Sequence, residues 1–270
     1  MKTLDDLINY LLKEIPEEQR IPIPTNIEEK KKLFRALCNV REPKPVSDEF
    51  LKAQDDYLQS ELAQKSLTDA LTLPAINEDF PNTDGKLSGA ARMALWRGDI
   101  TTLQSDAIVN AANAALLGCF APLHSCIDNI IHSASGVQLR LECNDLMQKQ
   151  GHPEPTGTAK ITKGYNLPAK YVIHTVGPII ASYPSAQQKK QLADCYRSCL
   201  ALAKEYNLKS LVFCNISTGV FHFPIDLAAQ IAICAVSDFF KENPESILKV
   251  IFNVFTYDNY QAYAKIFGDI

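Results

Sequence analysis

The chain has 270 residues, of which 46% are hydrophobic and 21% charged, and its formal net charge is −4. At about 150 residues for a typical domain, this length allows one large domain or two smaller ones, and the composition argues against a disordered chain. The negative charge disfavours nucleic acid as a partner, because the overall field repels phosphate groups.

The start of the chain and its cysteine content predict a cytoplasmic protein. Asp5 and Asp6 stand where a signal peptide would need an apolar core. No run reaches the roughly 18 apolar residues of a membrane span, so we expect no membrane contact. Eight cysteines are too few for a secreted disulfide scaffold of this length, which indicates reduced thiols. Cys119 and Cys126 stand close together around a histidine, whereas the other cysteines are scattered.

Residues 1–75 are predicted to form a helical N-terminal extension. Leucine and isoleucine recur at the three- and four-residue spacing of a helix face over residues 4–12. Thr25 and Glu28 have the spacing of a capping box, which predicts the start of a second helix. Ser47 and Asp48 are candidate caps for a third helix with an apolar stripe.

Residues 76–270 are predicted to form a second domain, in which strands alternate with helices. Short apolar runs typical of buried strands occupy 93–96, 107–109, 171–173, 211–213 and 250–252. Helical patterns occupy 127–134, 137–149, 187–206 and 225–241. This alternation favours a layered α/β domain with a largely parallel sheet. Ligands of such sheets bind at the carboxyl ends of strands, so the residues after each apolar run are the candidate site.

Several of these loops carry a family resemblance. The segments concerned are 97–101, 110–113, 118–126, 157–178 and 216–224. Together they resemble the macrodomain family of ADP-ribose-binding proteins over roughly residues 90–260. The resemblance implies a three-layer α/β/α macrodomain at 76–270 with a mixed, largely parallel central sheet, preceded by the helical extension at 1–75.

A narrower resemblance comes from Cys119, His124 and Cys126, which form a Cys-x4-His-x-Cys insertion. The insertion and the helical extension are similar to those of the zinc-containing macrodomains of bacteria, which are protein-ADP-ribose hydrolases often associated with a dedicated sirtuin. The resemblance implies Zn²⁺ as cofactor and an ADP-ribosylated protein as substrate, namely a lipoyl-carrier-like protein modified by a linked sirtuin. The chain lacks the glycine run with an acidic residue found in most hydrolytic macrodomains.

The residue types alone also favour zinc. Thiolate and imidazole are zinc ligands, and three protein ligands leave a fourth position for water or substrate, as in catalytic sites. The alternative is that Cys119 and Cys126 pack in the core, where cysteine is frequently buried. His132 and His152 are rival ligands, although His132 falls on a helix and is expected to be a structural hydrogen bonder. Asp128 is a candidate for capping that helix or orienting a ligand.

The resemblance assigns the ligand contacts. It places Asp99 at the adenine amino group, with Ile100 beside it, and Asn113 at the distal ribose. The diphosphate would bind the backbone N–H groups of a glycine-containing loop, formed by Ser217, Thr218, Gly219, Val220 and Phe221. From the residues alone, Asp99 is favoured as a turn cap. An aromatic of the last strand, at 252–255, or Tyr257 after it could cover adenine, but a core position is favoured for Phe252 and Phe255.

These observations support two functions. In the first, the protein hydrolyses the bond between ADP-ribose and a modified protein side chain, with Asn113, Cys119, His124 and Cys126 as the catalytic group. Zinc would activate water or bind the ribose hydroxyls and polarise the scissile bond. In the second, the protein is a non-catalytic reader of ADP-ribose with a structural zinc. A nucleic-acid module ranks last because no basic patch is present.

Overall fold

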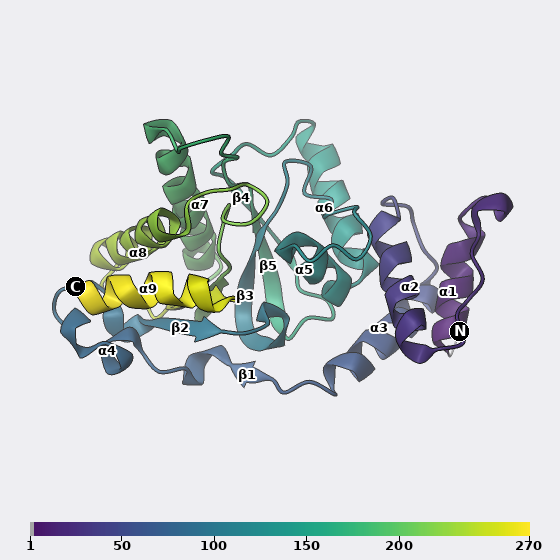
Figure 1. Cartoon of the computed structure of the whole chain (residues 1–270), viewed down its shortest axis with the longest axis horizontal. Helices are drawn as coiled ribbons and strands as arrows, with labels where there is room; N and C mark the ends of the chain where they lie inside the picture. Colours follow the sequence, from purple (N-terminus) through teal and green to yellow (C-terminus); the bar gives the residue numbers. More distant parts are fainter. Residues whose placement is uncertain (1–2) are drawn as a thin grey trace.

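A computed structural model describes residues 3–270 and shows a mixed sheet flanked by helices (Figure 1). Within these residues the sheet has seven strands, with the order β2-β7-β6-β3-β5-β4 and β1 beside β3. All pairs are parallel except β4 with β5. The strands are β1 (Thr68–Asp69), β2 (Met93–Arg97), β3 (Leu103–Ala111), β4 (Ala159–Lys163), β5 (Ala169–Thr175), β6 (Ser210–Phe213) and β7 (Lys249–Val254).

Helices lie on both sides of this sheet, which confirms the predicted α/β/α architecture. In Figure 1, α7, α8 and α9 lie to the left of β3 and β5, and α5 and α6 lie to their right. The helices of this part of the chain are α4 (Ile76–Asp79), α5 (Ile127–Ser135), α6 (Val137–Gln150), α7 (Ala186–Glu205), α8 (Ile225–Glu242) and α9 (Tyr257–Asp269). The predicted segments for α5 to α8 agree with these bounds to within one or two residues.

The central strands were recognisable in the sequence because parallel strands covered on both faces are continuously apolar. Ala107, Ile108 and Val109 of β3 are each fully buried. The edge strand β4 was not among the predicted apolar runs, since Lys160 and Lys163 interrupt its apolar residues. Helix α9 was also missed, because its apolar residues are spaced among polar ones and form no strong stripe.

The N-terminal region contains α1 (Leu4–Lys13), α2 (Ile27–Val40) and α3 (Asp48–Leu62), as predicted. Their apolar faces form a small core of their own, to which Val137 of α6 contributes. Ser47 caps α3 as expected, but the predicted capping box at Thr25 is wrong. Asn26 is the N-cap of α2, because its side chain accepts from the backbone N–H groups of Glu28 and Glu29.

Residues on both sides of position 70 tie the N-terminal region to the sheet. Thr68–Asp69 pair with β3, and Ala70 is fully buried in the main core. The predicted division between residues 75 and 76 stays a prediction, and the change from one core to the other falls before it. Across residues 3–270, every helix is too short or too polar to span a membrane.

His174 of β5 is hydrogen-bonded to the neighbouring strands β3 and β4 of the sheet. Its ring is fully buried, and the Asn110 amide donates to its Nδ1 at 3.1 Å. The ring therefore carries its proton on Nε2, which lies 2.9 Å from the Thr162 hydroxyl oxygen. Burial lowers the pKa of His174 to about 3, so the folded protein holds this ring neutral.

We expect this buried ring to make stability depend on pH. The folded pKa lies below the unfolded value of about 6.5, so the contribution to stability is complete above that pH and is lost as the pH falls toward the folded pKa. His174 should lower the free energy of unfolding by about 1.4 kcal/mol for each pH unit below 6.5. Urea unfolding between about pH 7.5 and pH 5 measures the slope.

In the His174→Gln variant, the free energy of unfolding should depend less steeply on pH, by the contribution of about one proton. His222→Gln is the control, because His222 is exposed. A slope that His174→Gln leaves unchanged would contradict the neutral, buried state of the ring.

Candidate functional site

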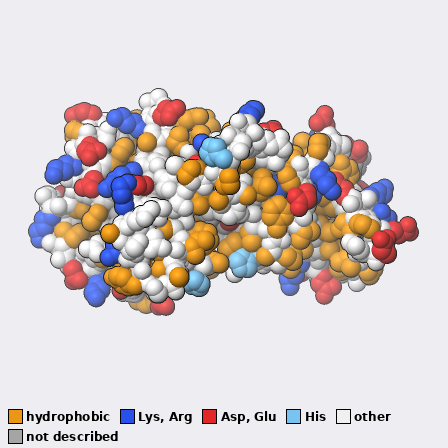
Figure 2. Space-filling view, turned by 90° about the horizontal axis from the view of Figure 1, so that it is seen from above, with side chains coloured by type: hydrophobic (Ala, Val, Ile, Leu, Met, Phe, Trp, Pro, Cys, Tyr) orange, Lys and Arg blue, Asp and Glu red, His pale blue; other side chains and the backbone are white. Residues whose placement is uncertain are grey.

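A cleft of about 1200 Å³ lies at the carboxyl ends of the strands. Loops 97–101, 110–113, 118–126 and 216–224 all contribute to its lining, so the structure brings the predicted site residues together. Helices α2 and α3 form the facing wall, with Arg35, Tyr57 and Lys65 among the lining residues. On the face drawn in Figure 2, hydrophobic side chains gather around the middle of the molecule, and charged ones are more numerous toward its ends.

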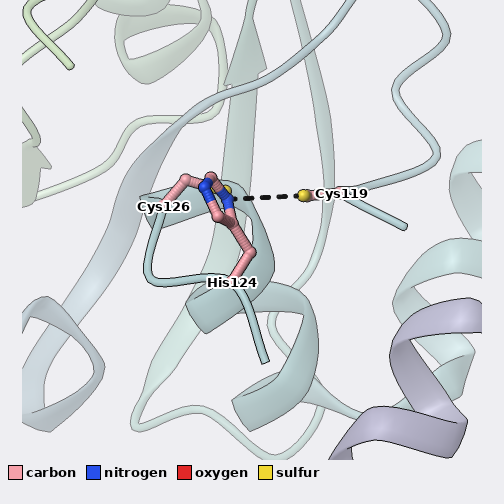
Figure 3. A group of neighbouring side chains, drawn as sticks. All are labelled: Cys119, His124 and Cys126. Carbon is pink, nitrogen blue, oxygen red and sulfur yellow. Dashed lines mark hydrogen bonds between the residues drawn. The ribbon is translucent and has the colours of Figure 1, made fainter. Parts of the chain in front are cut away.

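Cys119, His124 and Cys126 form one cluster at this cleft. Cys119 and His124 come from the loop after β3, and Cys126 is the N-cap residue of α5. Figure 3 shows the imidazole of His124 turned toward the thiol of Cys119, with Cys126 beside it. The potential ligand atoms all lie within 4.8 Å of one another, and each residue is partly buried.

The spacing of this cluster fits a tetrahedral zinc ion. Zinc bonds of about 2.3 Å to sulfur and about 2.0 Å to nitrogen, at the tetrahedral angle, place the two ligand atoms about 3.5 Å apart. The distance from Cys119 Sγ to His124 Nδ1 is 3.6 Å. Two sulfurs and one imidazole nitrogen also match the chemistry that zinc prefers. These residues therefore fit the predicted metal.

Asp128 organises the loop after β3 from the first turn of α5. Its buried carboxylate accepts from Asn110 Nδ2 at 2.8 Å and from Asn113 Nδ2 at 3.3 Å. Asn113 Nδ2 also donates to the Gly118 carbonyl at 3.0 Å, and Asn113 Oδ1 accepts from the Ala115 N–H at 3.0 Å. Both amide protons of Asn113 are thus used within the protein, and one lone pair of Oδ1 remains for a ligand.

Burial raises the pKa of Asp128 to about 6, although the hydrogen bond from Asn110 acts in the opposite direction. Of the two roles considered for Asp128, the structure favours orientation, since its oxygens receive the asparagine amides.

Asp99 caps a turn, as the residues alone favour, and keeps part of its carboxylate at the cleft. Its Oδ1 accepts from the N–H and the hydroxyl of Thr101, at 3.0 and 2.7 Å, and so caps the turn Ile100–Thr102. Its Oδ2 lies 3.4 Å from Lys65 Nζ, and the side chain remains 39% exposed at the cleft. Ile100 is buried beside it and also lines the cleft. Capping therefore leaves one carboxylate oxygen of Asp99 accessible to a ligand.

The loop at 217–221 presents free backbone donors. The backbone N–H groups of 218–221 make no hydrogen bond within residues 3–270. The Phe223 N–H donates to the Ser217 carbonyl at 2.9 Å, which closes the loop. A Cβ on Gly177 would lie 2.0 Å from Ser217 Oγ, so glycine at that position makes room for the loop. Successive free N–H groups of this kind suit an anion.

The structure also shows where Phe252, Phe255 and two further histidines lie. Phe252 is buried in the core as favoured, but Phe255 is 74% exposed and lines the cleft, because it follows the last residue of β7. His132 is buried with its Nε2 3.6 Å from Asp128 Oδ1, but neither ring nitrogen has a hydrogen-bond partner in the described chain, so its interpretation as a structural hydrogen bonder is not supported. His152 is exposed and does not line the cleft.

The contribution of α2 and α3 to the cleft was not predicted from the sequence. Arg35 and Tyr57 occur within amphipathic helical patterns, which predict the apolar face of a helix but not what its polar face meets, and Lys65 follows the end of α3. The contact arises only when the N-terminal region packs beside α5 and α6, as Figure 1 shows. No local motif in residues 1–75 marks these side chains as site residues.

Comparisons with known proteins show which family and which relatives this chain is similar to. The model of the macro domain family matches residues 109–232. A protein from Treponema medium named protein-ADP-ribose hydrolase is 49% identical over 260 residues, which are 96% of this chain and 96% of that protein. A protein of the same name from Staphylococcus aureus strain MSSA476 is 47% identical over 266 residues, 98% of this chain and 95% of that protein.

A solved structure is also similar to this chain. The Trypanosoma brucei macrodomain in complex with ADP-ribose matches with a TM-score of 0.65 and 30% identity. The match covers 86% of this chain and 94% of that one.

We expect Gly118 to be required for the packing of the cysteine loop. Gly118 has φ +78°, and a Cβ on it would lie 2.8 Å from the His132 ring, which is held in the core. Gly118→Ala should lower the free energy of unfolding by about 1–2 kcal/mol from the left-handed backbone and by about 1–3 kcal/mol more from overpacking. Thermal or urea unfolding measures this loss.

Gly151→Ala is the matched control for this variant. Gly151 has φ +75°, but a Cβ there would meet nothing within 4 Å. Equal losses of stability in the two variants would show that the contact with His132 does not matter.

Proposed function

The chain belongs to the macrodomain family, and we propose that it is a hydrolase that releases ADP-ribose from modified protein side chains. The observation that carries the proposal is the meeting of the Cys119–His124–Cys126 cluster, Asn113 and the free N–H groups of 218–221 in one cleft. The names of the two bacterial relatives support it, since each aligns with nearly the whole chain.

The proposed ligand contacts follow the length of the cleft. Asp99 Oδ2 accepts from the adenine amino group, and Ile100 gives an apolar contact beside it. The exposed ring of Phe255 supplies a further apolar surface at this end. The N–H groups of 218–221 donate to the diphosphate, whose charge suits a row of backbone donors. The remaining lone pair of Asn113 Oδ1 accepts from a hydroxyl of the distal ribose.

The proposed reaction is hydrolysis at the anomeric carbon of the distal ribose. The oxygen of water forms a bond to that carbon, the bond to the protein side chain breaks, and the side chain leaves with a proton. Asn113 positions the distal ribose in this reaction, because its amide is fixed by Asp128 and by the Gly118 carbonyl. A ribose bound to Oδ1 is thereby held next to the cysteine loop.

Cys119, His124 and Cys126 would hold the proposed Zn²⁺ ion. When bound, zinc supplies Lewis-acid chemistry and an open coordination position for water or for ribose oxygens. The family's usual acidic residue is absent from this loop. The fit between the tetrahedral geometry and the 3.6 Å separation of Cys119 Sγ and His124 Nδ1 supports the metal as its replacement.

The proposed protein substrate is a lipoyl-carrier-like protein modified by a linked sirtuin. This part of the proposal rests on the resemblance of the Cys-x4-His-x-Cys insertion and the helical extension to the zinc-containing macrodomains of bacteria. A cytoplasmic location likewise remains a prediction.

Loss of one metal ligand should abolish turnover but not binding. We expect Cys119→Ala to lower the rate of ADP-ribose release from a mono-ADP-ribosylated protein at least about 100-fold, because the contribution of a catalytic metal amounts to several kcal/mol. Its affinity for free ADP-ribose should change by less than about threefold, since most contacts lie elsewhere. Cys234→Ala, at an exposed cysteine of α8, is the control.

Two results would overturn parts of this proposal. Full turnover by Cys119→Ala, or by protein stripped of metal with a chelator, would exclude the zinc mechanism. Tight binding of ADP-ribose by the unaltered protein without any release would favour the reader function.

The affinity for ADP-ribose should depend on the carboxylate of Asp99. Asp99→Asn should weaken binding about tenfold in calorimetry, because a hydrogen bond to a charged acceptor is lost. Asp69→Asn is a matched control, since Asp69 caps the turn Ala70–Thr72 in the same way but does not line the cleft. Unchanged affinity in Asp99→Asn would remove Asp99 from the adenine contact.

A further inference from the structure

Helix α2 holds the cysteine loop from the side opposite the sheet. Arg35 Nη2 donates to the carbonyl oxygen of His124 at 2.8 Å. Asn39 Oδ1 accepts from the Leu123 N–H at 3.0 Å. Arg35 and Asn39 are four residues apart and so share a face of the helix. The N-terminal region therefore contacts the backbone of His124 and of the residue directly before it.

The same guanidinium connects this loop to α5. Arg35 Nη2 also donates to Asn129 Oδ1 at 2.8 Å, and Asn129 Nδ2 donates to the carbonyls of Cys119 and Ala121 at 3.3 and 2.9 Å. Asn129 is fully buried. Arg35 thus joins the two ends of the cluster, because it bonds directly to His124 and through Asn129 to Cys119.

Near His124 the loop gains little from apolar packing. Leu123 has φ +58°, a backbone conformation unfavourable for a branched side chain, and its side chain is 42% exposed. A strained and exposed residue next to His124 cannot hold the imidazole in place by apolar packing. The restraint comes instead from the hydrogen bond that Arg35 donates to the loop and the one that Asn39 accepts from it.

The position of Arg35 is not explained by the stability of the N-terminal region alone. Its Nε is buried and has no hydrogen-bond partner within the described residues, and an unsatisfied buried donor is unfavourable. The apolar core of this region is formed by other residues of α2, such as Leu33, Phe34 and Leu37. Arg35 is instead directed toward the loop and lines the cleft.

We propose that α2 is an integral part of the metal site, with Arg35 and Asn39 as positioning residues that hold His124 in place for binding Zn²⁺. The inference rests on the zinc site of the proposed function. Residues that orient a metal ligand from outside the coordination sphere commonly contribute 10- to 100-fold to affinity, which is about the effect expected here. The N-terminal region is then required for full metal affinity.

The test compares metal binding by Arg35→Ala and Asn39→Ala with that of the unaltered protein. Zinc affinity is measured by competition with a coloured chelator, and the visible spectrum after replacement by Co²⁺ reports the geometry of the ligands. Both variants should bind zinc about 10- to 100-fold more weakly and show an altered cobalt spectrum. Arg35→Lys keeps a positively charged hydrogen-bond donor and should recover part of the zinc affinity that Arg35→Ala loses.

Lys32→Ala is the matched control, because Lys32 is exposed on the same helix. Thermal unfolding of each metal-free variant reports whether the fold is retained. A variant that fails to fold is replaced by Arg35→Lys, whose zinc affinity should still fall below that of Lys32→Ala.

The possible outcomes separate this inference from the proposed function. Unchanged zinc affinity and cobalt spectra in folded Arg35→Ala and Asn39→Ala would overturn the role of α2 and leave the zinc mechanism intact. Failure of the unaltered protein to bind zinc would overturn both. Weaker metal binding by these variants, with Lys32→Ala unchanged, would support the inference.

Discussion

Parallel pairing in the sheet is the constraint on which the site depends. β2, β7, β6, β3 and β5 all run in the same direction, so the loops that follow them emerge at one edge. Loops that are more than one hundred residues apart in the chain, such as 97–101 and 216–224, therefore line the same cleft. A parallel sheet also needs long crossover connections, and these place helices such as α5 where their first turns face the ligand.

Within this arrangement, a buried carboxylate orders the loop after β3. Asp128 receives the amides of Asn110 and Asn113, and Asn110 also donates to the ring of His174 in β5. One network of hydrogen bonds thus runs from the sheet to the ligand-facing side of the cleft. Hydrogen bonds in a buried network are strengthened by the low local dielectric, which ties the conformation of this loop to the core.

The N-terminal region gives the cleft its second wall. Without α2 and α3, the edge of the sheet would open directly to solvent on that side, and the carbonyl of His124 would lose its contact with Arg35. Enclosure matters for the proposed chemistry, because electrostatic interactions with a phosphate or a metal are stronger where water is excluded. The two parts of the chain therefore form one site, although each has its own apolar core.

The sequence by itself determined the central strands, most helices and the loops that hold the candidate site, because buried parallel strands are apolar runs and polar residues follow them directly. The clustering of Cys119, His124 and Cys126 was also predictable, since these residues are close in the chain. Only the tertiary structure decided that Asn113 donates both amide protons to groups of the protein, that Phe255 is exposed, and that Arg35 lies at the cleft. These features depend on contacts between segments far apart in sequence, which local periodicity and spacing do not encode.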